Sequence, residues 1–192
     1  MDDLARLVGV LERGGVVACP TETWLGLLAD ARNERAVERV AELKGRPADM
    51  PIALLLPDAR AVAEVAETPS SAAEALMQTY WPGPLTILLT ARPDLSARLT
   101  RDGKVGARVP GPSPAADLVR AFGRPLTATS ANKTGEPPLR SVEELSAALA
   151  EGLGGLVPGV SPGGAPSTLI DSTTTPIEIV RMGAIEIDPA AL

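Results

Sequence analysis

Short apolar runs alternate with amphipathic stretches along the first two thirds of this 192-residue chain, and this alternation constrains the fold more than any other feature. Short continuous apolar runs are typical of strands, whereas apolar side chains that recur every three or four residues indicate helices. Alternating strands and helices favour an α/β fold, and the final third is richer in expected strands. We therefore predict an α/β domain with a twisted, largely mixed or antiparallel sheet and flanking helices.

The same periodicity predicts where the elements lie. Asn33 and Ser141 are expected helix N-caps, and Glu144 three residues after Ser141 completes a capping-box pattern. Pro114 suits the first turn of a helix. The Gly- and Pro-rich stretch 159–166 is expected to be a loop within the domain. The expected helices span residues 3–13, 34–43, 59–65, 71–80, 114–122 and 141–151, and the expected strands span 16–19, 52–56, 85–90, 105–109, 126–129, 168–170, 177–180 and 184–187.

The chain contains no histidine and one cysteine, Cys19. This composition excludes a Ser-His-Asp or Cys-His catalytic group, a His-ligated metal and an internal disulfide. We expect Cys19, inside an apolar strand, to be a small buried hydrophobe, and we assign no metal site to the protein itself. Any chemistry must therefore use lysine, arginine, hydroxyls, carboxylates, backbone amides or a bound Mg²⁺.

The formal net charge of −6 argues against a generally basic protein that coats nucleic acid, but it is compatible with a local basic cleft. No apolar run approaches the ~20 residues needed to cross a bilayer. The acidic N-terminus lacks the features of a signal peptide. We therefore expect a cytoplasmic protein without a membrane partner.

The stretch PTETWLGL, residues 20–27, directly follows the apolar run 16–19. A plain turn needs only Gly, Pro, Asn or Asp, whereas this stretch combines two threonine hydroxyls and a carboxylate with bulky apolar residues. We interpret it as a binding loop at the end of a strand. Its mouth is polar, and Trp24 and Leu25 are expected to pack beneath it.

Lys44 and Arg46 lie at the C-terminal end of the helix expected at 34–43. Cations there interact favourably with the helix dipole, and a lysine at a helix end contributes little to folding. The alternative is that both side chains bind phosphate or carboxylate, Arg46 through a bidentate contact and Lys44 as a point charge. The residues alone leave both interpretations open.

Ser130 and Asn132 follow the strand expected at 126–129, where they form either a turn or a set of donors for phosphoryl oxygens.

Arg108 lies within a strand of small apolar residues, so it points either to solvent or into a polar cavity. Ser167 adds a hydroxyl at a strand start, and Arg181 closes the next strand. Neither a Walker A sequence nor a GxGxxG after the first strand is present, so a phosphate site would be assembled from scattered side chains.

Six segments, in this order, resemble the YrdC/TsaC family, the threonylcarbamoyl-AMP synthases. Together they span nearly the whole chain, and the Lys-x-Arg and Ser-x-Asn pairs are the most specific. The chain ends shortly after the matching portion. We therefore expect the short form, a single YrdC-like domain over residues 1–192 without the extra C-terminal domain of longer members. The segments are PTETWLGL (20–27), KGRP (44–47), WPGPLT (81–86), ARVP (107–110), TSANKTG (129–135) and PSTLID (166–171).

The resemblance implies a twisted α/β sheet around a large, positively charged cavity. It also implies synthesis of threonylcarbamoyl-AMP and pyrophosphate from L-threonine, bicarbonate and ATP, with Mg²⁺ accompanying the ATP. The product would pass to a threonylcarbamoyl transferase complex for the tRNA modification threonylcarbamoyladenosine. Direct contact with tRNA or double-stranded RNA is left open.

By resemblance, the catalytic residues would be Lys44, Arg46, Ser130 and Asn132. The implied chemistry is transfer at the α-phosphorus of ATP, in which positioning and charge neutralisation supply most of the catalysis and no histidine is needed. The substrate-binding residues would be the same four together with Thr23, Arg108, Thr129, Ser167 and Arg181.

Two positions depart from the family pattern: Leu25 stands where an aromatic residue is usual, and Ser113 stands near a position that often holds histidine. They keep open a divergent paralogue that has lost threonine specificity and has an altered, carbamoyl-transfer or hydrolytic, activity. A YrdC-like RNA-binding module is a further alternative, although sparse lysines and aromatics argue against it.

Overall fold

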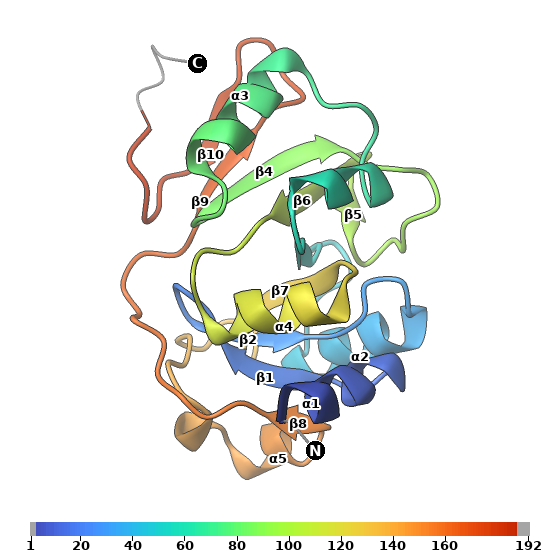
Figure 1. Cartoon of the computed structure of the whole chain (residues 1–192), viewed down its shortest axis with the longest axis vertical. Coiled ribbons are helices and arrows are strands. Elements are labelled where there is room, and N and C mark those ends of the chain that lie inside the picture. Colours follow the sequence, from blue (N-terminus) through green and yellow to red (C-terminus); the bar gives the residue numbers. More distant parts are fainter. Residues whose placement is uncertain (1–2, 188–192) are drawn as a thin grey trace.

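One mixed sheet runs through the computed structural model of the chain, which describes residues 3–187 (Figure 1). The strand order within these residues is β10-β9-β4-β6-β3-β7-β2-β1-β8, with β5 paired to β6. Neighbouring strands are mostly antiparallel, while the pairs β1–β8, β3–β6 and β4–β9 are parallel, which confirms the expected mixed sheet. The strands are β1 (Val17–Pro20), β2 (Leu25–Leu28), β3 (Ala53–Leu55), β4 (Leu85–Thr90), β5 (Thr100–Arg101), β6 (Lys104–Arg108), β7 (Leu126–Ser130), β8 (Gly155–Leu156), β9 (Thr168–Asp171) and β10 (Glu178–Arg181).

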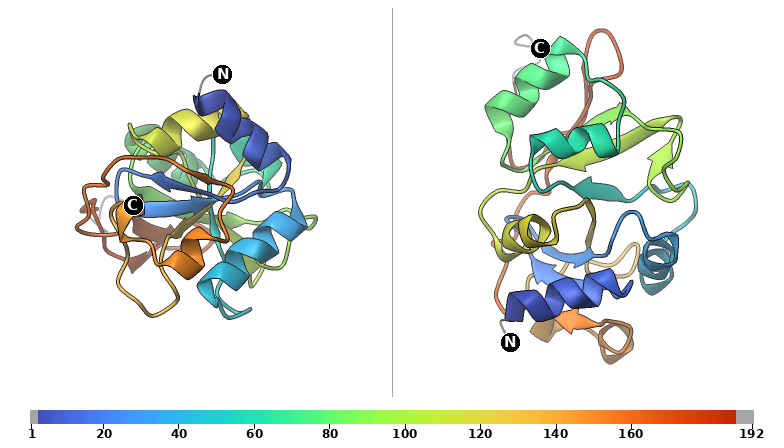
Figure 2. Two further views of the ribbon diagram at one scale, coloured as in Figure 1. Left: turned by 90° about the horizontal axis from the view of Figure 1, so that it is seen from below. Right: turned by 45° about the vertical axis from the view of Figure 1, so that its right-hand side comes forward.

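The helices cover both faces of this sheet. Seen from below, α1 and α4 lie together on one side of the strands, and α2 and α5 lie on the other (Figure 2). No helix within residues 3–187 combines the length and the apolar character needed to cross a membrane. The helices are α1 (Asp3–Glu12), α2 (Glu34–Lys44), α3 (Ser71–Tyr80), α4 (Pro114–Phe122) and α5 (Ala147–Ala150), with 3-10 turns η1 (Ala59–Glu64) and η2 (Val142–Glu144).

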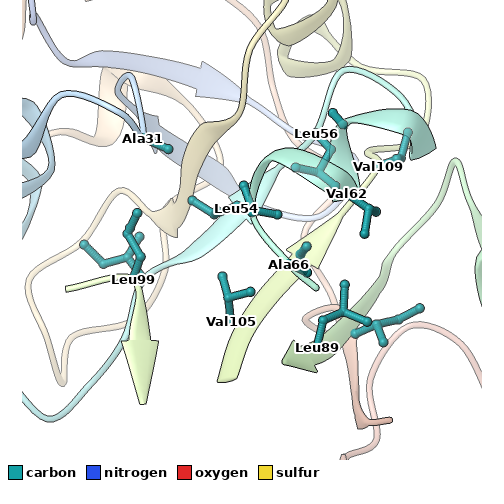
Figure 3. Close-up of a cluster of buried hydrophobic side chains, with 14 of the residues drawn as sticks. Ala31, Leu54, Leu56, Val62, Ala66, Leu89, Leu99, Val105 and Val109 are labelled. Carbon is teal, nitrogen blue, oxygen red and sulfur yellow. The ribbon is translucent and has the colours of Figure 1, made fainter. Parts of the chain in front are cut away.

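Two apolar clusters form the core. The smaller cluster packs α1 and α4 against β1 and β7, and it includes the fully buried thiol of Cys19. Burial raises the pKa of that thiol to about 12, so it acts as the expected small hydrophobe. The larger cluster packs α2, η1 and α3 against the rest of the sheet, and Figure 3 shows part of it around Leu54, Val62 and Val105. Aliphatic side chains fill almost all of both clusters.

The helix termini follow the sequence signals closely. The Asn33 side chain accepts a hydrogen bond from Ala36 N (3.2 Å), which caps α2. Gly45 ends α2 at φ 55°, a left-handed conformation that glycine adopts without strain. Ser113 caps α4 through Ala116 N (3.2 Å), and Pro114 opens the helix. Ser113 therefore serves as the N-cap of this helix.

Three expectations about the elements are wrong. Residues 25–28 are strand β2, which forms a hairpin with β1, so only the turn between them is a loop. The helix expected at 141–151 is interrupted at Leu145, whose extended backbone (ψ 135°) separates η2 from α5. Residues 184–187 form no strand, and the backbone of Ala184 instead donates to Pro166 O (2.8 Å). The segment expected as a helix at 59–65 is helical, as the 3-10 helix η1.

Strand β7 joins the two halves of the sheet, because it pairs with β3 along one edge and with β2 along the other. The buried Thr127 hydroxyl contributes to the second edge. It accepts from Ala29 N (2.9 Å) and donates to Leu27 O (3.1 Å), so it satisfies two backbone groups that lie between the strands.

Replacing Thr127 with valine keeps the shape of the side chain but removes its hydroxyl. Two buried backbone groups then lose a partner, so we expect Thr127→Val to lower the free energy of unfolding by about 2 kcal/mol or more. Denaturant unfolding measures this change, with Thr127→Ser as the control that keeps the hydroxyl. A valine variant as stable as wild type would show that the hydroxyl does not hold β2 to β7.

Candidate active site

A cavity of about 470 Å³ opens where the two halves of the sheet meet, and its volume is in the range of small-molecule sites. Its walls come from the β1–β2 turn, the loop after α2, and strands β3, β4, β6, β7, β9 and β10. Gly164 and Pro166 of the Gly- and Pro-rich loop also line it. That loop lies across the sheet rather than between domains, because Thr21 N donates to Ser161 Oγ (3.2 Å) and Gly163 N donates to Thr23 O (2.8 Å).

Seven of the nine residues expected at the site line this cavity: Thr23, Arg46, Arg108, Thr129, Ser130, Ser167 and Arg181. They come from segments far apart in the sequence, and the fold brings them together. Among the described lining residues, the three charged side chains are all arginines. The cavity is therefore basic although the chain as a whole carries a net charge of −6.

Arg46 is held by the loop that follows α2. Its Nε donates to Met50 O (2.9 Å) and its Nη2 to Pro51 O (2.7 Å). Its Nη1 lies 3.4 Å from the hydroxyl of Thr129, so the guanidinium reaches the end of β7. Burial lowers the pKa of Arg46, but an arginine pKa starts so high that the side chain keeps its charge.

Arg108 stands at the end of β6 with 8% of its side chain exposed, which decides between the two sequence interpretations in favour of the cavity. Its Nη1 lies 2.8 Å from a carboxylate oxygen of Glu22 in the β1–β2 turn. The contact is an ion pair by distance, but its angles do not meet those of a hydrogen bond. Burial lowers the pKa of Arg108, Glu22 opposes this effect, and the nearby charge of Arg181 adds to it.

Arg181 and Ser167 form a further part of the cavity lining. The Nη2 of Arg181 donates to Ser167 O (2.8 Å), and the Ser167 hydroxyl pairs with the Thr86 hydroxyl (2.9 Å). Thr86 also lines the cavity but was not among the expected residues. The segment WPGPLT, which contains it, could have indicated it.

The β1–β2 turn is organised by the hydroxyl of Thr21. This hydroxyl accepts from Thr23 N (3.0 Å) and Trp24 N (3.1 Å), donates to Trp24 O (2.7 Å) and lies 3.1 Å from the Thr23 hydroxyl. Leu25 is fully buried, as expected, and it lines the floor of the cavity. Trp24 is only half-buried and forms part of the cavity wall, so the expectation that it packs beneath the loop is wrong.

Lys44 and Asn132 are the two expected residues that do not line the cavity. Only 2% of Lys44 is exposed, and its Nζ donates to Ser130 O and to Asn132 O (2.6 Å). Its own carbonyl accepts from Thr134 N (2.8 Å). The Asn132 side-chain amide donates to Lys133 O (2.9 Å) and Glu136 O (2.7 Å). Both residues therefore fix the loop after β7.

This arrangement corrects the expectation that Lys44 contributes little to folding. A buried ammonium that joins the end of α2 to the loop after β7 is part of the framework of the site. Burial, and then the charge of Arg46, lower the pKa of Lys44 from 10.5 to about 8.

Comparison with known proteins places the chain in a family. The Sua5/YciO/YrdC family model, described as telomere recombination, matches residues 9–183. The chain belongs to the Sua5/YciO/YrdC family. Among solved structures, the P. abyssi Sua5 complexed with L-threonine superimposes with a TM-score of 0.86 at 32% identity, covering 95% of this chain and 54% of that one.

Two relatives named threonylcarbamoyl-AMP synthase show how far the similarity extends. The Bacillus subtilis protein is 35% identical over 95% of this chain but only 54% of its own length, so the chain spans about half of that relative. The Xanthomonas campestris protein is 35% identical over 95% of this chain and 96% of its own length. A family member of nearly the same extent as this chain therefore exists.

The buried charge of Lys44 predicts a pH-dependent stability. The pKa of Lys44 is about 8 in the folded protein and 10.5 when the side chain is unburied, so the unfolded chain binds more protons between these values. The free energy of unfolding then rises with pH across this window, by up to about 3 kcal/mol.

Denaturant unfolding between pH 8 and 10.5 measures this rise. It should disappear in Lys44→Met and persist in the matched control Lys133→Met, whose side chain is exposed. Parallel pH profiles for wild type and Lys44→Met would contradict the burial of a charged lysine.

Proposed function

We propose that this protein makes threonylcarbamoyl-AMP and pyrophosphate from L-threonine, bicarbonate and ATP. The observation that carries the proposal is the basic cavity, in which three arginines and six hydroxyl side chains face a space of about 470 Å³. The naming of the relatives as threonylcarbamoyl-AMP synthases supports it, and so does the L-threonine in the P. abyssi Sua5 complex.

The charge of the cavity suits these substrates. ATP and bicarbonate are anionic and L-threonine carries a carboxylate, so each presents an oxygen group that a guanidinium recognises well. The arginines come from three separate segments, which allows them to contact different groups of a bound ligand. The hydroxyls of Thr23, Thr129, Ser130 and Ser167 supply neutral donors for the remaining oxygens.

The reaction requires two steps. The amine of threonine adds to bicarbonate, and loss of water gives a carbamate. A carbamate oxygen then attacks the α-phosphorus of ATP, and pyrophosphate leaves with the electron pair of the broken bond. Catalysis of such a transfer rests on positioning and on stabilising the developing charge, for which arginines and hydroxyls suffice.

The residues of this chain divide into two roles. Arg46, Arg108 and Arg181 would bind the anionic groups and offset the charge that shifts onto pyrophosphate. Ser130 and Thr129, at the end of β7, would orient phosphoryl oxygens through their hydroxyls. Lys44 and Asn132 would act indirectly, because their side chains fix the end of β7 at Ser130 and the loop that follows it.

Mg²⁺ would come with ATP. Within residues 3–187 no group of carboxylate, histidine or cysteine side chains is arranged to hold a metal ion, so the donor set fits a metal carried by the nucleotide phosphates. When bound, the ion would neutralise part of the triphosphate charge. The product would pass to a threonylcarbamoyl transferase complex that modifies tRNA.

Pyrophosphate release from ATP tests the proposal directly. We expect the purified protein to release pyrophosphate only when L-threonine and bicarbonate are both present. Omitting each substrate in turn provides the controls. Pyrophosphate release that does not depend on threonine would favour a carbamoyl-transfer or hydrolytic enzyme instead. No release under any condition would contradict an adenylating activity.

The variant Ser130→Ala tests whether the Ser130 hydroxyl, at the end of β7, serves catalysis rather than folding. Lys44 contacts the backbone oxygen of Ser130, so the variant keeps that contact and loses only a cavity hydroxyl. We expect kcat/KM to fall by about 10- to 100-fold, as for a lost hydrogen bond to a charged group, with the free energy of unfolding within about 0.5 kcal/mol of wild type. Full activity in this variant would remove Ser130 from the site.

A further inference from the structure

A buried carboxylate lies directly behind the basic wall of the cavity. Glu22 does not line the cavity, but its Oε1 is 2.8 Å from Nη1 of Arg108, which does. The side chains are 12% and 8% exposed, and both Glu22 oxygens and this Arg108 nitrogen are closed off from solvent. No reaction step proposed above uses Glu22.

The pair leaves part of Arg108 available to a ligand. Nη1 faces the carboxylate, and within the described residues no hydrogen bond joins the other guanidinium nitrogens to a protein group. Because Arg108 lines the cavity, those nitrogens are the donors that a carboxylate or phosphoryl group entering the cavity would meet.

Glu22 is held in this place by the backbone around it. It stands between Thr21 and Thr23 in the turn that the Thr21 hydroxyl organises. Its aliphatic stem fits against Gly111, where an added Cβ would lie 3.5 Å from the Cγ of Glu22. The carboxylate therefore meets Arg108 as a fixed group rather than as a freely moving surface side chain.

A buried guanidinium needs a counter-charge, and Glu22 supplies it within the protein. An anionic ligand that reaches Arg108 brings a second negative charge to the same cation. Glu22 repels that ligand and also shares the guanidinium with it, so the carboxylate weakens binding. An anionic product that is bound less tightly is also released more readily.

We propose that Glu22 is a positioning residue that serves as the internal counter-ion of Arg108 and limits the affinity of the cavity for the carboxylate or phosphate group that Arg108 accepts. The proposal rests on the proposed function only in requiring an anionic ligand in the cavity. It does not depend on the formation of threonylcarbamoyl-AMP.

The test is the affinity of Glu22→Gln for three separate probes: ATP, L-threonine and inorganic pyrophosphate, each titrated by calorimetry. The amide is nearly the same size as the carboxylate but carries no charge. We expect Kd to fall by about tenfold, or about 1.4 kcal/mol, for at least one probe. The probe that tightens identifies whether Arg108 accepts a phosphate or a carboxylate group.

Salt dependence and a matched variant distinguish this role from a structural one. In Glu22→Gln, binding of the tightened probe should weaken more steeply as salt is added. The substitution removes one negative charge beside Arg108, so the net charge there is more positive by one. Glu64→Gln, which neutralises the partner of Arg32 in an ion pair (2.5 Å) away from the cavity, should leave all three affinities unchanged. A merely structural Glu22 would lower the melting temperature without tightening any probe.

If Glu22→Gln does not fold, Glu22→Asp provides the test. Its carboxylate keeps the charge but is withdrawn from Arg108 by one methylene group, so we expect a smaller tightening of about threefold. If wild type binds a probe and neither variant tightens it, this inference is overturned while the proposed function stands. If wild type binds none of the three, both are overturned.

Discussion

Strand β7 is the element on which the site depends, because it pairs with β2 on one edge and β3 on the other and ends at the cavity. Two buried polar side chains fix its position. The Thr127 hydroxyl satisfies backbone groups of Leu27 in β2 and of Ala29 just after it, and the Lys44 ammonium binds the carbonyls of Ser130 and Asn132. Buried polar groups of this kind are costly unless they are fully paired, so they specify one arrangement of the strand. Thr129 and Ser130 reach the cavity as a consequence.

The cavity concentrates positive charge in an acidic protein. Three arginines from separate segments line it, although the chain as a whole carries a net charge of −6. A local field of this sign attracts anionic ligands whatever the overall charge. Glu22, which does not line the cavity, partly neutralises the charge of Arg108. The affinity for anions is therefore set by the arginines and this carboxylate together.

The bounds of helices and strands were predicted best where the sequence marks both ends of the element clearly. Helix α4 and strand β4 have the expected bounds, since Pro114 and a glycine frame the helix and a continuous apolar run forms the strand. Strand β2 was missed because its apolar residues continue a polar turn, and the two-residue strands β5 and β8 are too short to produce a pattern. The motifs predicted seven of the side chains that line the cavity. They could not predict that Lys44 turns away from the cavity toward backbone carbonyls, because tertiary contacts decide that orientation.

Arg46, Arg108 and Arg181 line one cavity, and we propose that they bind one anionic ligand together. The position of bound nucleotide in a crystal structure grown with ATP and L-threonine tests this most directly. We expect triphosphate oxygens within hydrogen-bonding distance of guanidinium groups from at least two of these residues. Nucleotide bound outside the cavity, or inside it without contact to any of the three arginines, would contradict the proposed binding mode.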